Sequence, residues 1–108
     1  MTEQHLNIAG YKFVLLDDRD ALRKPLKQTC DVLGLKGTIL LSHEGINIFV
    51  SGPTKAIGTF RDQLCKDSRF ADIEFKESFS NHQPFNRMNV RLKQEIFSVG
   101  LPNFDRVD

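Results

Sequence analysis

Apolar residues either run together or alternate with polar ones in five short segments of the chain. Aromatic and β-branched side chains are frequent in these segments, which favours strands over helices. The first segment is almost continuously apolar, which is typical of a strand inside a sheet rather than at its edge. The fourth alternates cleanly and predicts a strand with one face in water. The predicted strands cover residues 11–16, 37–42, 46–51, 73–77 and 90–93, the last with an alternative end at Phe97.

A helix is predicted between the first two strands, because apolar residues recur there at helical spacing. These apolar positions are Leu22, Leu26, Cys30 and Leu33. Gly34 follows them and supplies the left-handed residue that ends many helices. Pro25 leaves two alternatives, a helix that begins late with Pro25 in its first turn and a longer helix that kinks there.

A second helix is predicted after the third strand. Ser51 or Gly52 lies near its N-cap and Pro53 falls in its first turn, where the missing N–H of proline is tolerated. The side chains spaced for its buried face are Ile57, Phe60 and Leu64.

The order of these elements predicts the fold. His43, Glu44 and Gly45 form a short connector, so the second and third strands are a hairpin. Strand, helix, strand, strand, helix, strand is the split βαβ order of ferredoxin-like (acylphosphatase-like) folds. We therefore predict an α+β sandwich, with two helices on one face of a mostly antiparallel sheet and an extra fifth strand.

Composition fits one small domain and excludes several classes of protein. The chain has 108 residues, a net charge of +1, 40% hydrophobic residues and two cysteines. No apolar run reaches the roughly 18–20 residues of a membrane span, and two cysteines at unrelated spacing indicate reduced thiols in a cytoplasmic protein. We expect a leader at 1–9, the ferredoxin-like domain at 10–98, and the start of a linker at 99–108.

No self-contained catalytic or metal site is evident. The histidines are scattered, Cys30 and Cys65 belong to different predicted helices, and no phosphate-binding glycine motif occurs. A Cys–His nucleophile pair depends on distances that spacing alone does not give. Cys30 occupies an apolar helix position, where a small buried hydrophobe is the commoner role. We therefore assign no catalytic residue, metal or cofactor to this chain.

The sheet face away from the helices carries the main candidate site. If alternate residues of each strand face the core, the opposite face collects cations, an amide and one aromatic ring. The candidate RNA-binding residues are Asn47, Phe49, Lys76, Arg87, Arg91 and Lys93. Cations for phosphates and a ring for stacking are what a single-stranded nucleic acid needs. The alternatives are a solvated face, or a face whose exposed phenylalanine meets another protein domain.

A second candidate is the predicted hairpin at residues 42–47. His43, Glu44 and Asn47 could position a ligand or transfer protons. The alternative is turn chemistry, in which Gly45 adopts a positive φ and the polar side chains hydrogen-bond the local backbone.

Several sequence runs together resemble one known family. The matching runs are 22–26, Cys30, 33–41, Glu44-Gly45-Ile46-Asn47, 50–52, 56–57, 67–70 and 84–96. Over residues 10–100 the chain resembles the N-terminal domain of bacterial rhodanese-domain proteins described as oxygen-dependent tRNA uridine hydroxylases. The resemblance implies a parent enzyme that uses molecular oxygen to install 5-hydroxyuridine at the tRNA wobble position, with tRNA and a rhodanese-like domain of the same chain as partners.

The chain departs from the family pattern in three places. Ile48-Phe49 stands where the family has Gly-Thr, and Asn89 stands where it has Lys. The rhodanese-like domain of the family, which holds the cysteine linked to activity, is not expected within a chain that ends at Asp108. Cys30 and Cys65 do not match that cysteine, so we do not assign them its role.

Two other classes of function share this fold. An acylphosphatase-like enzyme needs a phosphate-cradling loop with an arginine after the first strand, whereas Asp17-Asp18 stand there and would repel an acyl phosphate. A small-molecule regulatory module would bind its ligand between the helices and a sheet edge, or at a dimer interface.

Overall fold

Five strands form one sheet, in the order β4-β1-β3-β2-β5. The computed structural model describes residues 4–93. The elements are β1 (His5–Phe13), α1 (Arg19–Leu33), β2 (Lys36–Ser42), β3 (Gly45–Pro53), α2 (Thr54–Leu64), the short 3-10 helix η1 (Ser68–Phe70), β4 (Phe75–Ser80) and β5 (Met88–Leu92).

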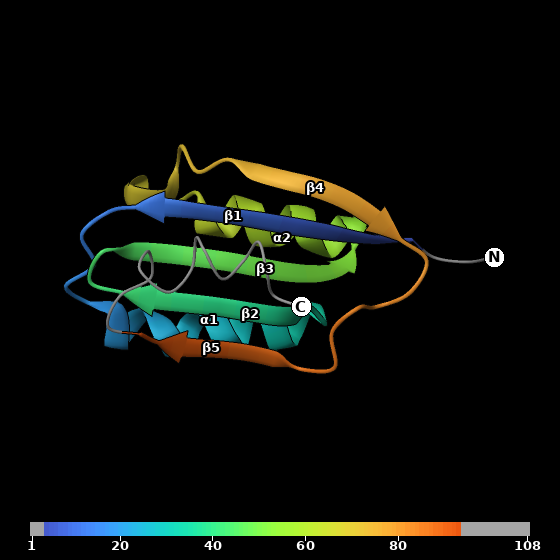
Figure 1. Cartoon of the computed structure of the whole chain (residues 1–108), viewed down its shortest axis with the longest axis horizontal. Coiled ribbons are helices and arrows are strands. Elements are labelled where there is room, and N and C mark those ends of the chain that lie inside the picture. The colour runs from blue at the N-terminus through green and yellow to red at the C-terminus, as the bar shows by residue number, and fades with distance from the viewer. Residues whose placement is uncertain (1–3, 94–108) are drawn as a thin grey trace, which may run out of the picture.

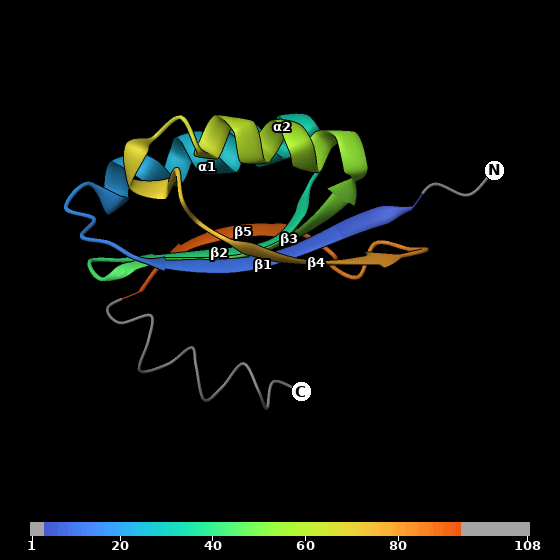
Figure 2. The same ribbon diagram turned by 90° about the horizontal axis from the view of Figure 1, so that it is seen from above.

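Both helices cover the same face of the sheet (Figures 1 and 2). Neighbouring strands from β4 to β2 are antiparallel, whereas β5 is parallel to β2. This arrangement confirms the predicted α+β ferredoxin-like fold with its extra strand. We call the face under α1 and α2 the inner face, and the opposite face the outer face.

The inner face is the hydrophobic core. Ile39 of β2 pairs with Ile48 of β3, and both side chains are fully buried. The buried face of α2, formed by Ile57, Phe60 and Leu64, packs into the same cluster and confirms the predicted helix spacing. Burying these apolar side chains supplies the main driving force for folding.

The strand β1 begins six residues earlier than predicted, so the leader expected at 1–9 is wrong from His5 onward. Leu6 and Ile8 are buried on the inner face, in alternation with Asn7, which is the period of a half-buried strand. The strand also ends earlier, at Phe13, after which Val14 N–H donates to the Glu44 carbonyl at 3.0 Å.

The helix limits resolve the alternatives at the two prolines. Pro25 lies inside α1, so the helix does not begin late at this proline, and Gly34 ends it with a φ of 74° as predicted. Pro53 is the N-cap of α2 rather than a residue of its first turn. Ser51 and Gly52 belong to β3, because they continue its pairing with β1.

The last two strands differ from the prediction at their ends. β4 begins at Phe75 rather than Ile73, although Ile73 is buried as expected. Leu92 was expected in the core but is 40% exposed, because β5 is the edge strand of the sheet. Phe97, the domain end at residue 98 and the linker at 99–108 lie outside the described residues.

Candidate nucleic-acid interface

Strand register places four of the six candidate residues in two adjacent rows on the outer face. The first row runs across all five strands and consists of Lys76, Ala9, Phe49, Thr38 and Asn89. The second row consists of Tyr11, Asn47, Leu40 and Arg91. The outer face therefore presents a cation on β4, a cation on β5 and aromatic side chains between them.

The remaining two candidates lie at the ends of β5. Lys93 directly follows the strand, and its backbone N–H donates to the Leu41 carbonyl at 2.7 Å, which extends the pairing with β2. The alternation of β5 then places Lys93 on the same side as Arg91. Arg87 precedes the strand with an exposed side chain, and its carbonyl accepts from Gly37 N–H at 3.0 Å.

Asn47 is less accessible than its outward position suggested. Its side chain faces outward, in register with Tyr11 and Leu40, but it is only 3% exposed. Phe49 in the next row is partly exposed, and Lys76 and Arg91 are exposed. The accessible candidate side chains of these two rows are therefore cations and an aromatic ring, whereas the amide of Asn47 is buried.

Sequence reasoning missed two aromatic residues of this surface. Tyr11 and Phe13 are 50% and 58% exposed, and their ring centroids lie 5.7 Å apart. The nearly continuous apolar run correctly indicated a strand inside the sheet, but the prediction did not identify which of its side chains face outward. The signal that could have identified them was Lys12, which interrupts the run and places the two rings together on one face.

The outer face changes character toward the start of β1. Asn7 Nδ2 donates to the hydroxyls of Ser78 at 3.4 Å and Ser80 at 3.3 Å, while Ser51 Oγ donates to Asn7 Oδ1. These hydrogen bonds link β3, β1 and β4, and the polar side chains serve as one another's partners. This part of the described outer face therefore differs from the part with Tyr11 and Phe49, because hydrogen-bonded polar side chains occupy it.

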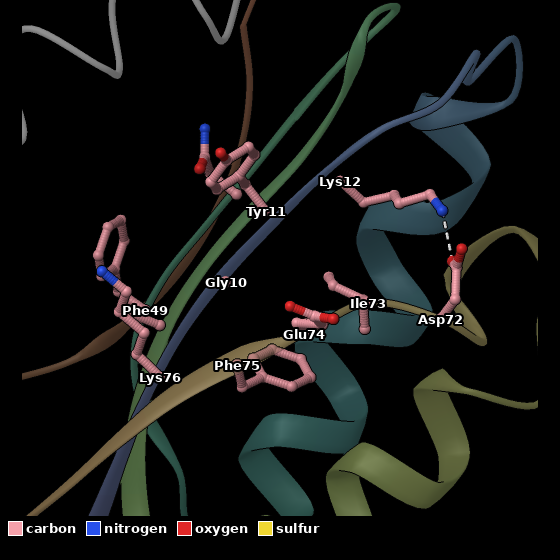
Figure 3. A pocket seen from close by; sticks show the side chains of 11 residues that line it. Gly10, Tyr11, Lys12, Phe49, Asp72, Ile73, Glu74, Phe75 and Lys76 are labelled. Atoms are coloured by element: carbon pink, nitrogen blue, oxygen red, sulfur yellow. Dashed lines mark hydrogen bonds and ion pairs between the residues drawn. The ribbon is translucent and has the colours of Figure 1, made fainter.

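A groove of about 680 Å³ opens where β4 separates from β1. Figure 3 shows Tyr11, Phe49 and Lys76 on one side of the strands, and Ile73 and Phe75 on the other. The register between the two strands stops at Gly10 and Phe75, so the groove wraps around the edge of β1.

Beside this groove, Lys12 forms an ion pair with Asp72. The hydrogen bond from Lys12 lowers the pKa of the Asp72 carboxyl below its usual value. The lysine is thus already paired with a carboxylate, which makes it a weaker phosphate ligand than Lys76.

In the hairpin at residues 42–47, the hydrogen bonds involve backbone groups, as in the turn alternative. The Glu44 N–H donates to Ser42 Oγ at 3.0 Å, and the His43 carbonyl accepts from Leu16 N–H at 3.0 Å. Gly45 has a φ of 155°, and a Cβ there would lie 2.0 Å from the Lys12 carbonyl oxygen. The His43 and Glu44 side chains are exposed, while Asn47 lies on the outer face, so the structure does not bring the three together in one pocket.

The loop after β1 is held by a cluster of charges. The Arg69 guanidinium donates to Asp18 Oδ1 at 2.7 Å and to Asp67 Oδ2 at 2.7 Å. These hydrogen bonds hold the pKa of both carboxyls below their usual value and raise the pKa of Arg69. The loop therefore carries one carboxylate, Asp18, that is ionised and paired at neutral pH.

Among the described residues, the thiols and potential metal ligands form no second site. Cys30 is fully buried, and burial raises the pKa of its thiol to about 12. Cys65 is partly buried, with Sγ 3.6 Å from the Phe70 carbonyl. Within residues 4–93, no three His, Cys, Asp or Glu side chains are grouped to hold a metal ion, and no helix is long and apolar enough to cross a membrane.

The fold and the outer face define an acylphosphatase-like α+β domain with a cationic and aromatic sheet surface. Residues 5–96 match the family described as the UPF0176 acylphosphatase like domain. The chain belongs to this family.

Curated relatives carry one consistent name. The chain is 54% identical over 99 residues to a protein of Cupriavidus necator named tRNA uridine(34) hydroxylase, an alignment of 92% of this chain and 35% of that protein. A protein of Bordetella avium with the same name is 54% identical over 97 residues, covering 90% of this chain and 40% of that protein. The chain thus spans about a third of the length of the relatives it matches.

Solved structures show the same fold at low sequence identity. A Klebsiella pneumoniae BlrP1 complex has a TM-score of 0.71 at 17% identity, over 95% of this chain and 27% of that one. Full-length HypF has a TM-score of 0.59 at 13% identity, over 86% of this chain and 13% of that one. These likenesses concern the fold alone.

Proposed function

We propose that this chain is the N-terminal domain of a tRNA uridine hydroxylase and that its outer face contributes tRNA binding. The observation that carries the proposal is the pair of rows in which Lys76, Phe49 and Arg91 share one face. Curated relatives named tRNA uridine(34) hydroxylase support the identity of the parent protein. Protonated side chains contact phosphates, and a ring stacks on an unpaired base whatever its sequence.

The chemistry of the parent enzyme would take place outside this chain. The resemblance implies 5-hydroxylation of the wobble uridine with molecular oxygen as co-substrate, and a rhodanese-like domain that holds the activity-linked cysteine. Cys30 is a poor substitute, since a fully buried thiol with a pKa near 12 is not ionised at neutral pH. We therefore expect this chain alone to bind tRNA without modifying it, in the cytoplasm where tRNA is modified.

An acylphosphatase-like activity is disfavoured by the loop after β1. An acyl phosphate is an anion and needs cationic or N–H donors at that loop. Asp17 and Asp18 are exposed there, and the Arg69 guanidinium that contacts this loop is engaged by Asp18 and Asp67. Turnover of benzoyl phosphate by the purified chain would contradict this assignment.

A second candidate function is docking of another domain of the parent protein. Tyr11 and Phe13 place two half-exposed rings side by side on the outer face, and exposed aromatic pairs are typical of protein interfaces. A small-molecule module would instead use the groove between β1 and β4, and a ligand-induced rise in melting temperature would favour it.

The proposal is tested by tRNA binding to the purified chain over a series of salt concentrations. Lys76→Glu should weaken binding and make the salt dependence shallower, because fewer counterions are released. Lys55→Glu on α2 is the matched control, since it makes the same charge change on the opposite layer. Equal effects of the two substitutions, or no salt-sensitive binding by the unaltered chain, would contradict tRNA binding by the outer face.

A further inference from the structure

Three cations from two layers of the molecule meet at the free side of β5. They line a shallow groove of about 460 Å³, together with one apolar side chain, and no acidic residue lines it within the described chain. The lining residues are Arg23, Arg91, Leu92 and Lys93. Arg23 comes from α1, so the groove joins the helical layer to the sheet.

Arg23 is held in this place by a defined contact. Its Nε donates to the Val90 carbonyl at 2.9 Å, on the side of β5 that faces away from β2. This hydrogen bond satisfies an edge carbonyl and fixes the plane of the guanidinium. The two terminal amino groups keep their N–H donors, and within residues 4–93 neither forms a hydrogen bond.

The groove also continues the outer face. Arg91 belongs both to the second row, beside Leu40, and to the groove lining. A chain of phosphates that leaves the outer face at Arg91 would therefore reach Arg23 by passing around the edge of the sheet. Successive phosphates of a nucleic-acid strand need cations spread along such a path rather than in one pocket.

We propose that this edge groove binds the phosphodiester backbone of the RNA, with Arg23 and Arg91 as guanidinium ligands on either side of it. The inference rests on the proposed function and extends it from the sheet to α1. Arginine suits this role because its planar fork donates two parallel hydrogen bonds to one phosphate. Leu92, between Arg91 and Lys93 in sequence, also lines the groove, and its apolar side chain does not compete for hydrogen bonds with an anion.

The test compares Arg23→Glu with Lys24→Glu in tRNA binding, each introduced into the purified chain of 108 residues. Both substitutions reverse one exposed charge on the same helix, but only Arg23 lines the groove. Arg23→Glu should weaken binding about tenfold at low salt and lower the salt slope by about one, whereas Lys24→Glu should change the affinity less than about twofold. Arg23→Lys should keep most of the salt slope, because it keeps the charge and loses only the fork.

Folding and the parent function are checked separately. Circular dichroism and melting temperature show whether the Arg23→Glu protein is still folded after losing the contact with Val90. If it is unfolded, the Arg23→Gln variant is measured in its place. Weakening by Lys76→Glu without any effect of the Arg23 variants would overturn the edge groove while leaving the proposed function intact. No effect of either would overturn both. Saturable binding of inorganic phosphate at the groove, with tRNA affinity unchanged in Arg23→Glu, would assign the groove to a free anion and also overturn the proposal.

Discussion

The two faces of the sheet are made from the same strands but differ in what explains their residues. On the inner face of β3, Ile46, Ile48 and Val50 are fully buried, and packing against the helices accounts for each of them. On the outer face of the same strand, Asn47 and Phe49 lie beside β1 with its exposed rings, and the exposed cations Lys76 and Arg91 lie on the edge strands β4 and β5. Packing accounts for the residues of the inner face, whereas the exposed rings and cations of the outer face indicate a binding partner.

This difference predicts that substitutions on the two faces affect different measurements. Inner-face variants should change the free energy of unfolding and leave RNA affinity unaltered while the protein is folded. Outer-face variants should change RNA affinity and leave unfolding nearly unaltered. A variant that changes both would show that the two faces are coupled through the sheet.

The largest expected effect is in the core between the inner face and the helices. Phe60→Ala removes a ring that is 1% exposed in the core, which should lower the free energy of unfolding by about 3–5 kcal/mol. Phe13→Ala is the matched control, because that ring is 58% exposed on the other face and should cost less than about 1 kcal/mol. Urea unfolding followed by circular dichroism measures both, and similar losses would contradict the assignment of the two faces.

The next effect is on RNA affinity. Arg91→Glu combined with Lys93→Glu should weaken tRNA binding by about 2–4 kcal/mol at low salt and lower the salt slope by about two. Unfolding should be nearly unchanged, because the Lys93 backbone contact to Leu41 does not need either side chain. A well-folded double variant with unaltered affinity would show that these charges form only a solvated face.

Cys30→Ser tests the core between α1 and the inner face with a nearly isosteric change. A hydroxyl at this fully buried position lacks a good partner, so the free energy of unfolding should fall by about 1–3 kcal/mol, with tRNA affinity unchanged. Cys65→Ser, at a partly buried thiol, should cost less. In the native protein a thiol reagent should modify Cys65 first, and rapid modification of Cys30 would contradict its burial.

Phe49→Ala tests stacking separately from charge. If a base stacks on this ring, tRNA affinity should fall by about 1–3 kcal/mol with little change in the salt slope, because no phosphate contact is lost. Tyr11→Ala should have a similar effect if the two rows bind adjacent bases. A loss of contact with another domain of the parent protein, without any loss of tRNA affinity, would instead favour docking on this face.

The inner face was largely predictable from the sequence, because apolar periodicity reports burial directly. The face of α2, the hairpin and the left-handed Gly34 were all predicted from local patterns. The errors lie where tertiary pairing extends or shortens a strand, as at His5 and Gly52, which continue β1 and β3 beyond their most apolar stretch. Such limits depend on a partner strand that is distant in sequence.

The outer face was only partly predictable. Alternation correctly placed Phe49, Lys76 and Arg91 on one face, but it did not give the order of the strands. The strand order decides that Lys76 and Arg91 lie on opposite edges, with rings between them. The edge groove could not be predicted at all, because it depends on Arg23 of α1 reaching the outermost strand, a contact between residues 67 positions apart.

The smallest expected effect concerns the charges that hold the loop after β1, outside both faces. The hydrogen bond from Arg69 lowers the pKa of Asp18 in the folded protein below its ordinary value of 3.8. A carboxyl with a depressed pKa stabilises the folded state above its unfolded pKa, and this contribution is lost as the pH falls through the folded pKa. The pair is exposed, so the contribution is small.

Asp18→Asn should therefore destabilise the protein slightly at pH 7, and the difference from the unaltered chain should shrink as the pH falls below about 3.8. Urea unfolding at pH 7, 5 and about 3 measures it. Asp62→Asn on α2 is the control, since it removes an equal charge from a residue without an ion pair in the described chain. The tRNA affinity should not change, because this loop contributes no cation to either row. A difference between Asp18→Asn and the unaltered chain that grew toward low pH would contradict the Arg69 contact, because only a carboxyl with a raised pKa behaves in that way.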